Sequence, residues 1–150
     1  MQRSIINYQP IIPFVLLIAL IIYESITSLY TYITPLAGYI FLYIIENFEN
    51  KDKRWTIVVL FIYLAYFELD RGFFILSSLI LFLIYYNFIH EELEATIACQ
   101  NCLKATIILI YYFGFYILNL LFALIFNYSL PKLDITYIVF IISDIVMVLL

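Results

Sequence analysis

The sequence predicts an all-α, polytopic integral membrane protein: a bundle of about six transmembrane helices forming a single domain over residues 1–150. Of the 150 residues, 67% are hydrophobic and 12% are charged. Soluble domains have about 45–50% and about 25%, so most of this surface cannot face water. Because a span needs about 20 mostly apolar residues, the chain has room for five or six spans with short loops. The runs 56–67 and 105–126 are apolar on every face, which favours helices over the alternating strands of a membrane barrel.

Charged and turn-forming segments divide the apolar sequence. Residues 24–34 are more polar than their surroundings, 46–54 are densely charged, and 68–72 interrupt the next apolar run. Residues 90–104 form a longer polar stretch, and 129–134 carry the proline and the charges of a turn. The spans predicted between these loops are 9–25, 34–48, 54–69, 72–89, 105–128 and 134–150.

Basic residues are divided unevenly between the two faces of this predicted bundle. The N-terminus and the second and fourth loops carry Arg3, Lys51, Lys53, Arg54 and Lys104. The opposite face carries Arg71 and Lys132. Since short cytoplasmic flanks are the ones enriched in Lys and Arg, both termini are predicted to be cytoplasmic.

Glu68, Asp70, Arg71 and Gly72 form a tight charged hairpin between the predicted third and fourth spans. One interpretation is a polar anchor or a small pocket, because carboxylates withdrawn from water need a partner. The other is a solvated turn. Glu68 and Asp70 are two residues apart and diverge on a helix, which argues against a cooperating pair of catalytic carboxylates.

Two further polar residues interrupt the predicted spans. Asp144 lies about ten residues into the last span, where an unpaired charge costs at least ~2.5 kcal/mol, so we expect it to face protein or water. A helix contact is favoured over a proton or ion relay. Asn119 in the fifth span is expected to hydrogen-bond to a neighbouring helix.

Cys99 and Cys102 have the spacing of a redox pair, but the predicted setting is unfavourable. A thiolate is activated at a helix N-terminus, whereas residues 90–104 are predicted to be a short amphipathic segment on the membrane surface. The acids Glu91, Glu92 and Glu94 would raise the pKa of a thiol. The predicted face is also the reducing cytoplasm.

Several classes of function are disfavoured by composition. The net charge of -4 is scattered among loops, which argues against a nucleic-acid partner. Two cysteines with one histidine fall short of the four ligands of a structural zinc site. With no Gly-rich phosphate loop and no complete nucleophilic arrangement, we expect a protein that is not an enzyme, has no cofactor and has the lipid bilayer as a partner.

The layout resembles that of the rod shape-determining protein MreD family, small multi-span subunits of the bacterial cell-elongation machinery. The similarity is carried by the segments 34–36 (TPL), 51–55 (KDKRW) and 68–79 (ELDRGFFILSSL). MreD proteins tend to end the third span with an acid and to place a glycine four positions later, as Glu68 and Gly72 do here. The family's usual acid is Asp, a polar residue often stands where this chain has Leu36, and a second glycine is expected near Leu76.

The resemblance implies a non-catalytic scaffold in the bacterial cytoplasmic (inner) membrane. Such a subunit associates with an MreC-like membrane protein and, through it, with a peptidoglycan synthase pair, a transglycosylase and a transpeptidase. A rival hypothesis is a small-molecule-binding subunit resembling the substrate-capture component of energy-coupling-factor transporters, with an outward polar cavity involving Glu68 and Asp70. A third is a membrane thiol oxidoreductase that uses Cys99 and Cys102, which requires their loop to be extracytoplasmic.

Overall fold

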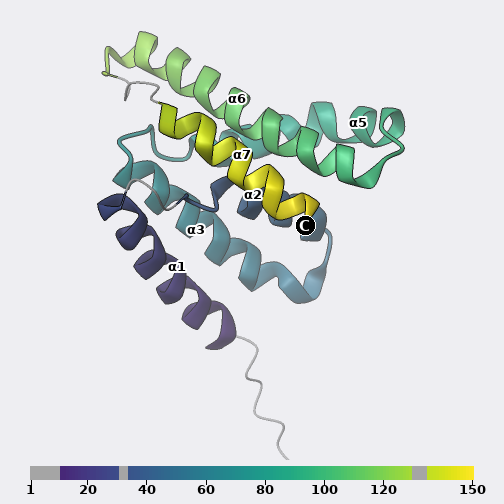
Figure 1. Cartoon of the computed structure of the whole chain (residues 1–150), viewed down its shortest axis with the longest axis horizontal. Helices are drawn as coiled ribbons and strands as arrows, with labels where there is room; N and C mark the ends of the chain where they lie inside the picture. The colour runs from purple at the N-terminus through teal and green to yellow at the C-terminus, as the bar shows by residue number, and fades with distance from the viewer. Residues whose placement is uncertain (1–10, 31–33, 130–134) are drawn as a thin grey trace, which may run out of the picture.

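The computed structural model describes residues 11–30, 34–129 and 135–150. All regular secondary structure in these ranges is helical, so the predicted all-α class is confirmed (Figure 1). The elements are α1 (Ile11–Leu29), α2 (Ala37–Asn47), η1 (Lys51–Lys53), α3 (Arg54–Asp70), α4 (Ser77–Ile84), η2 (Tyr85–Ile89), α5 (His90–Thr96), α6 (Gln100–Phe126) and α7 (Ile135–Leu149). Arg3, Lys132 and the first residues of the first and last predicted spans lie outside the described ranges.

The predicted span limits match α3 and α7 within one residue and differ from the other helices by several residues at one end or both. Residues 24–29 belong to α1 and not to a loop, because their polar side chains find partners inside the protein. The fourth span begins at Ser77 and not at residue 72. The polar stretch 90–104 is also largely helical: it contains α5 and the first turn of α6, separated by residues 97–99.

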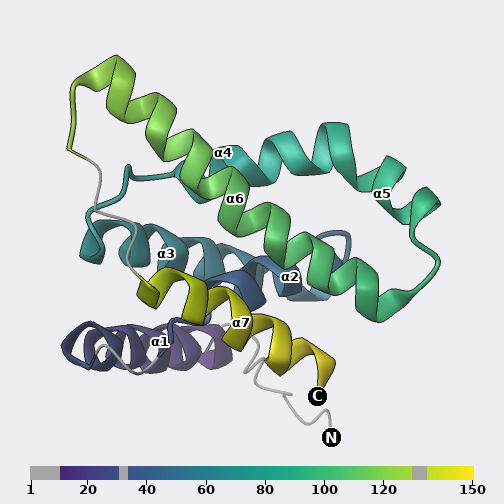
Figure 2. The same cartoon turned by 45° about the horizontal axis from the view of Figure 1, so that its top comes forward.

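Helices α4, η2 and α5 form one uninterrupted helical stretch that runs beside α6 and then diverges from it (Figure 2). The middle part, Tyr85–Ile89, is a π-helix, which locally widens the helical turn. The sequence predicts that the fourth span ends at residue 89 and that a separate surface segment follows. The helix instead continues from α4 through η2 into α5 without a break.

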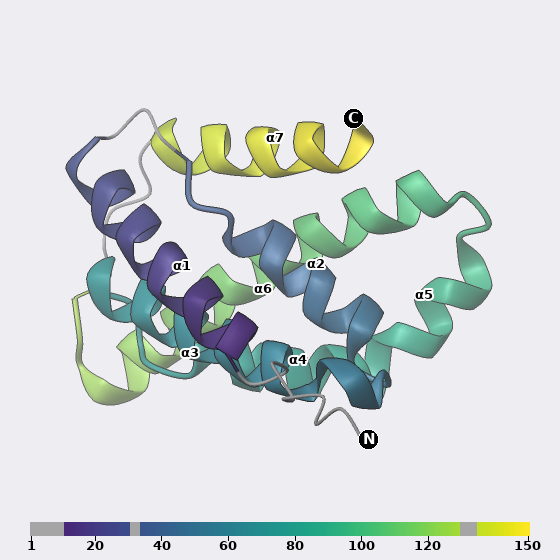
Figure 3. The same cartoon turned by 90° about the horizontal axis from the view of Figure 1, so that it is seen from below.

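Helix α2 lies in the interior of the bundle, in contact with α3, α6 and α7 (Figure 3). Its aromatic residue Phe41 is fully buried and packs against Phe82, Tyr85 and Tyr111, the last with ring centroids 4.6 Å apart. α1 packs mainly on α3, and α7 on α6 and α2. The core is therefore built around a short central helix.

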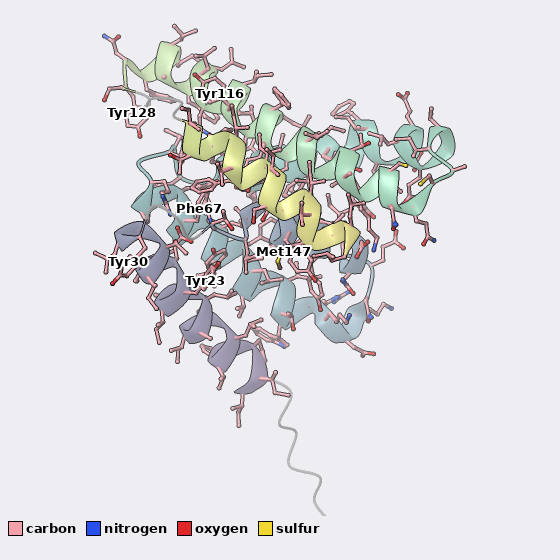
Figure 4. All side chains as sticks on the ribbon, in the orientation of Figure 1. Tyr23, Tyr30, Phe67, Tyr116, Tyr128 and Met147 are labelled. Atoms are coloured by element: carbon pink, nitrogen blue, oxygen red, sulfur yellow. The ribbon has the colours of Figure 1, made fainter. Side chains whose placement is uncertain are left out.

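Basic side chains lie at both ends of the bundle. Lys53 Nζ donates to Asn47 Oδ1 at 2.6 Å, and Lys104 Nζ lies 3.1 Å from Glu46 Oε1, so both amines meet the C-terminal part of α2. Arg71 lies at the other end of α3. Figure 4 places Tyr30 and Tyr128 at this second end.

Large apolar side chains cover much of the outer surface, among them Phe14, Phe113, Leu124 and Ile138, each more than half exposed. Within the described residues, α1 and α6 are long and apolar enough to cross a membrane, and α7 is a shorter apolar helix. These two helices indicate association with a membrane.

Candidate functional site

Glu68, in the last turn of α3, binds the N-terminus of α4. Its side chain is fully buried. Oε2 accepts a hydrogen bond from the backbone N–H of Leu76 at 2.6 Å, and Oε1 accepts from the N–H of Ser78 and from the Ser77 hydroxyl. The first N–H groups of a helix have no partner within the helix and favour a negative charge. Both carboxylate oxygens are therefore used to cap α4.

Asn119 of α6 holds the same loop from the opposite side. Its Oδ1 accepts a hydrogen bond from the backbone N–H of Phe74 at 2.8 Å, and its Nδ2 donates to Ser77 Oγ and to the Phe115 carbonyl. The amide is 1% exposed. The prediction that Asn119 joins helices is confirmed, since it ties α6 to the α3–α4 loop and to the start of α4.

Arg71 reaches back to α1. Its Nε lies 3.3 Å from Glu24 Oε1, and its Nη2 donates to Thr27 Oγ1 at 3.2 Å. Tyr63 of α3 donates to the other Glu24 oxygen at 2.9 Å. Because Glu24 is fully buried, these partners replace the water that it loses, and breaking such a pair costs about 3–5 kcal/mol. This cluster fastens α1 to the end of α3.

The loop between Glu68 and α4 contains two residues in the left-handed region, Gly72 at φ +73° and Leu76 at φ +69°. Glycine takes this conformation freely, whereas a leucine there is strained by about 1–2 kcal/mol. Leu76 holds it because its N–H is bound to Glu68 and its carbonyl accepts from Ile80. The loop thus turns sharply twice, and these turns place the N-terminus of α4 next to the Glu68 carboxylate.

Asp144 occupies a second, separate site at the N-terminus of α2. Its Oδ2 accepts hydrogen bonds from the Gly38 backbone N–H at 2.9 Å and from the Tyr112 hydroxyl at 2.7 Å. Within the described part of the chain, the buried Oδ1 has no hydrogen-bond partner. The expectation of a helix contact is confirmed, because Asp144 joins α7 to α2 and α6.

The closeness of this contact depends on Gly38. A Cβ at position 38 would lie 2.6 Å from Asp144 Oδ2 and 2.7 Å from Tyr112 Cε2. Neighbouring groups extend the join, since Thr34 Oγ1 and Ser143 Oγ are 2.8 Å apart and the Tyr137 hydroxyl donates to the Tyr112 carbonyl. Because Gly38 has no side chain, α7 has room to pack closely against the start of α2.

The structure brings some of the predicted site residues together and separates others. Glu68, Gly72 and Asn119 meet at the α3–α4 loop, and Arg71 lies beside them but turns to α1. Asp70 is exposed whereas Glu68 is buried, in agreement with the divergence that their spacing predicts. Asp144 belongs to the other site. Among these described site residues, no two ionisable side chains face one open cavity together.

Sequence reasoning missed Glu24, Tyr63, Tyr112 and Gly38. Glu24 carries a usable signal, since it is a single carboxylate beside a long apolar run, but it falls where the predicted span 9–25 meets the polar segment 24–34. Tyr63 and Tyr112 are two among 15 tyrosines and carry no distinguishing pattern.

Among the residues that the structure describes, no group of three or more His, Cys, Asp or Glu side chains could hold a metal ion. No protein-family model, curated protein or solved structure matches this chain.

Proposed function

We propose that the chain is a multi-span protein of the bacterial inner membrane, with a cytoplasmic N-terminus, that acts as a non-catalytic scaffold. In this proposal it is an MreD-like subunit of the cell-elongation complex. It binds transmembrane helices of an MreC-like protein and thereby contributes to peptidoglycan synthesis and cell shape.

The distribution of charge supports the membrane arrangement. Lys53 and Lys104 lie with the C-terminal part of α2 at one end of the bundle, while Arg71 lies at the opposite end of α3. α1 and α3 run in the same direction, since Glu24 and Arg71 meet near their C-terminal ends. Both observations support successive spans that alternate in direction, with the more basic end in the cytoplasm.

The observation that carries the scaffold proposal is an open lateral groove between α3 and α4. It has a volume of about 310 Å³ and is lined mainly by apolar side chains, including Val58, Ile62, Ala65 and Leu79. Glu68 lines its inner wall, but both of its oxygens are occupied by α4. A groove of this kind offers packing and no free polar group, which suits an apolar partner helix.

The same groove argues against the transporter alternative. A substrate-capture subunit predicts an outward polar cavity that uses Glu68 and Asp70 together. Glu68 is directed into the protein and Asp70 is exposed, so the two carboxylates do not share a cavity.

The backbone of the α3–α4 loop supports the MreD-like assignment. The resemblance expects glycines four positions after the acid and near position 76, and this chain has Leu76 at the second place. Both Gly72 and Leu76 have the positive φ that glycine favours. A loop of the family's kind is therefore compatible with this chain despite the leucine.

A groove-filling variant tests the partner interaction. Ala65→Trp would fill the groove, and Ala123→Trp on α6 is a matched control, because both alanines are partly exposed and Ala123 is not among the residues that line it. We expect affinity purification from native membranes to recover an MreC-like protein and the synthase pair with the wild type and the control. Ala65→Trp should reduce this recovery at least fivefold and produce rounded cells.

Two results would overturn the proposal. One is equal recovery of the elongation proteins with both tryptophan variants, which would remove the groove as the binding site. The other is a wild-type protein that recovers no elongation protein and whose depletion leaves cell shape unchanged.

The topology has its own test. Cys99 and Cys102 are exposed at the end of the bundle predicted to be cytoplasmic. A membrane-impermeant maleimide should label them only after the cells are opened, while a cysteine introduced at the exposed position Asp70 should be labelled in intact cells. Labelling of Cys99 from outside would reverse the assigned orientation.

A further inference from the structure

Cys99 and Cys102 are placed at the N-terminus of the longest described helix. Cys99 is the residue that precedes α6, with extended backbone angles, and Cys102 is in the first turn. Both side chains are exposed, and the Cys102 thiol donates a hydrogen bond to Cys99 Sγ with the two sulfurs 2.7 Å apart. The sequence analysis did not predict a helix N-terminus at the cysteines, but the structure has one, because α6 begins at Gln100.

This position favours a thiolate on Cys99. The N-terminus of a 27-residue helix presents partial positive charge from its free N–H groups. The pKa of Cys99 lies below its ordinary value, first because the Cys102 thiol donates to it and then because the N–H groups of Cys102 and Asn101 face it.

The neighbouring charged groups do not cancel this effect. Glu94 on α5, the acid expected to raise a thiol pKa, has its Oε1 3.6 Å from His90 Nε2. Lys104 on α6 is paired with Glu46. Glu91 and Glu92 on α5 do not contribute to the lowered pKa of Cys99. The expected raising of a thiol pKa by the preceding acids is not found at Cys99.

We propose that Cys99 and Cys102 form a reversible dithiol–disulfide site that exchanges with external disulfides, Cys99 being the attacking thiolate and Cys102 the resolving thiol. This site is independent of the scaffold proposal, since it depends only on the helix terminus and on exposure to water. Its substrates are disulfides that reach the end of α6, either small molecules such as oxidised glutathione or protein disulfides.

The exchange proceeds in two displacements. The Cys99 thiolate attacks one sulfur of the disulfide RS–SR, which forms a mixed disulfide and expels RS⁻. Cys102 gives its proton to that thiolate, attacks Cys99 Sγ and expels the second RS⁻, which takes a proton from water. The two protein thiols lose two electrons, and the external disulfide gains them to become two RSH.

The experiment is a redox titration of the purified full-length protein in detergent with reduced and oxidised glutathione, read by mass spectrometry after alkylation. Cys102→Ser removes the resolving thiol. The double variant Cys102→Ser/Asn101→Cys is the matched control, because it keeps two exposed thiols but moves one around the helix. All three positions are exposed, and circular dichroism checks that helix content is unchanged.

We expect the wild type to form an intramolecular disulfide, with an equilibrium constant at least tenfold larger than that of the control, and Cys102→Ser to accumulate the glutathione mixed disulfide. The pH midpoint for alkylation of Cys99 should also be lower in the wild type than in Cys102→Ser. Equal constants in wild type and control, mixed disulfides at both wild-type cysteines, or disulfides that form only between two copies of the chain would each overturn the proposal.

Discussion

Glu68 and Asp144 are both buried carboxylates that accept a hydrogen bond from the start of a helix, yet they do so in different ways. Glu68 uses both oxygens, and its partners are 8 to 10 residues away in the chain. Asp144 accepts two hydrogen bonds on one oxygen, from Tyr112 and from Gly38, which is 106 residues away. The first site closes a local hairpin, whereas the second exists only once the whole bundle has assembled.

Removing each carboxylate in turn is the strongest test of the difference between the two sites. Glu68→Ala leaves two backbone N–H groups without their acceptor, while the Ser77 hydroxyl keeps the Phe74 carbonyl, so we expect a loss of about 3–5 kcal/mol in the free energy of unfolding. Asp144→Ala removes the acceptor of two donors and should cost about 2–3 kcal/mol. Denaturant titration in detergent micelles measures both. A larger cost at Asp144 would contradict the comparison.

The Asp144 site can be disturbed from the other side by adding one carbon atom. Gly38→Ala places Cβ against Asp144 Oδ2 and Tyr112, so α7 must move away from α2 at a cost of about 2–4 kcal/mol. The matched control is Gly114→Ala, where Cβ would meet only the flexible end of Leu81 at 2.7 Å and the cost should be about 1 kcal/mol. Equal thermal stability of the two variants would show that α2 and α7 adjust freely.

Amide substitutions sharpen the difference between the carboxylates. In Glu68→Gln the new amide nitrogen must face a donor on one side, so we expect a loss of about 1–3 kcal/mol. In Asp144→Asn the single oxygen can still accept from Gly38 and Tyr112, and the nitrogen takes the place of Oδ1, which already lacks a partner, so only unsatisfied N–H groups add to the cost and the loss should be about 1 kcal/mol. The ranking fails if Asp144→Asn is the more damaging change in the same unfolding titration.

The smallest effect concerns the backbone of the Glu68 hairpin. Gly72→Ala should cost about 1 kcal/mol through strain alone, because the nearest atom to its Cβ would be the Tyr128 hydroxyl at 3.7 Å. Leu76→Gly relieves the same strain but increases the flexibility of the unfolded chain, so its net effect should be a gain below about 1 kcal/mol. Opposite shifts in the thermal midpoint are expected, and a loss of stability on Leu76→Gly would show that the leucine side chain matters more than its φ.

The two sites also differ in how well they could be predicted from the sequence. Apolar runs located α3 within one residue, and the polarity of 68–72 located the hairpin, because both signals are local. The contact between Asp144 and Gly38 could not be predicted, since no pattern connects residues 106 positions apart. Hydropathy also ended α1 too early and started α6 too late, because a helix continues through polar residues that find buried partners, as Glu24 does, or that stay exposed, as Gln100 and Asn101 do.

The unequal lengths of the last two helices have a consequence for the surrounding lipid. At about 1.5 Å per residue, the 27 residues of α6 extend about 40 Å and the 15 residues of α7 about 22 Å, against a hydrocarbon layer of about 30 Å. In the proposed multi-span arrangement, the bilayer beside α7 would become thinner to meet this helix, while the first turn of α6 would project into the headgroup region. A change in membrane thickness would therefore affect the α7 side of the protein differently from the α6 side.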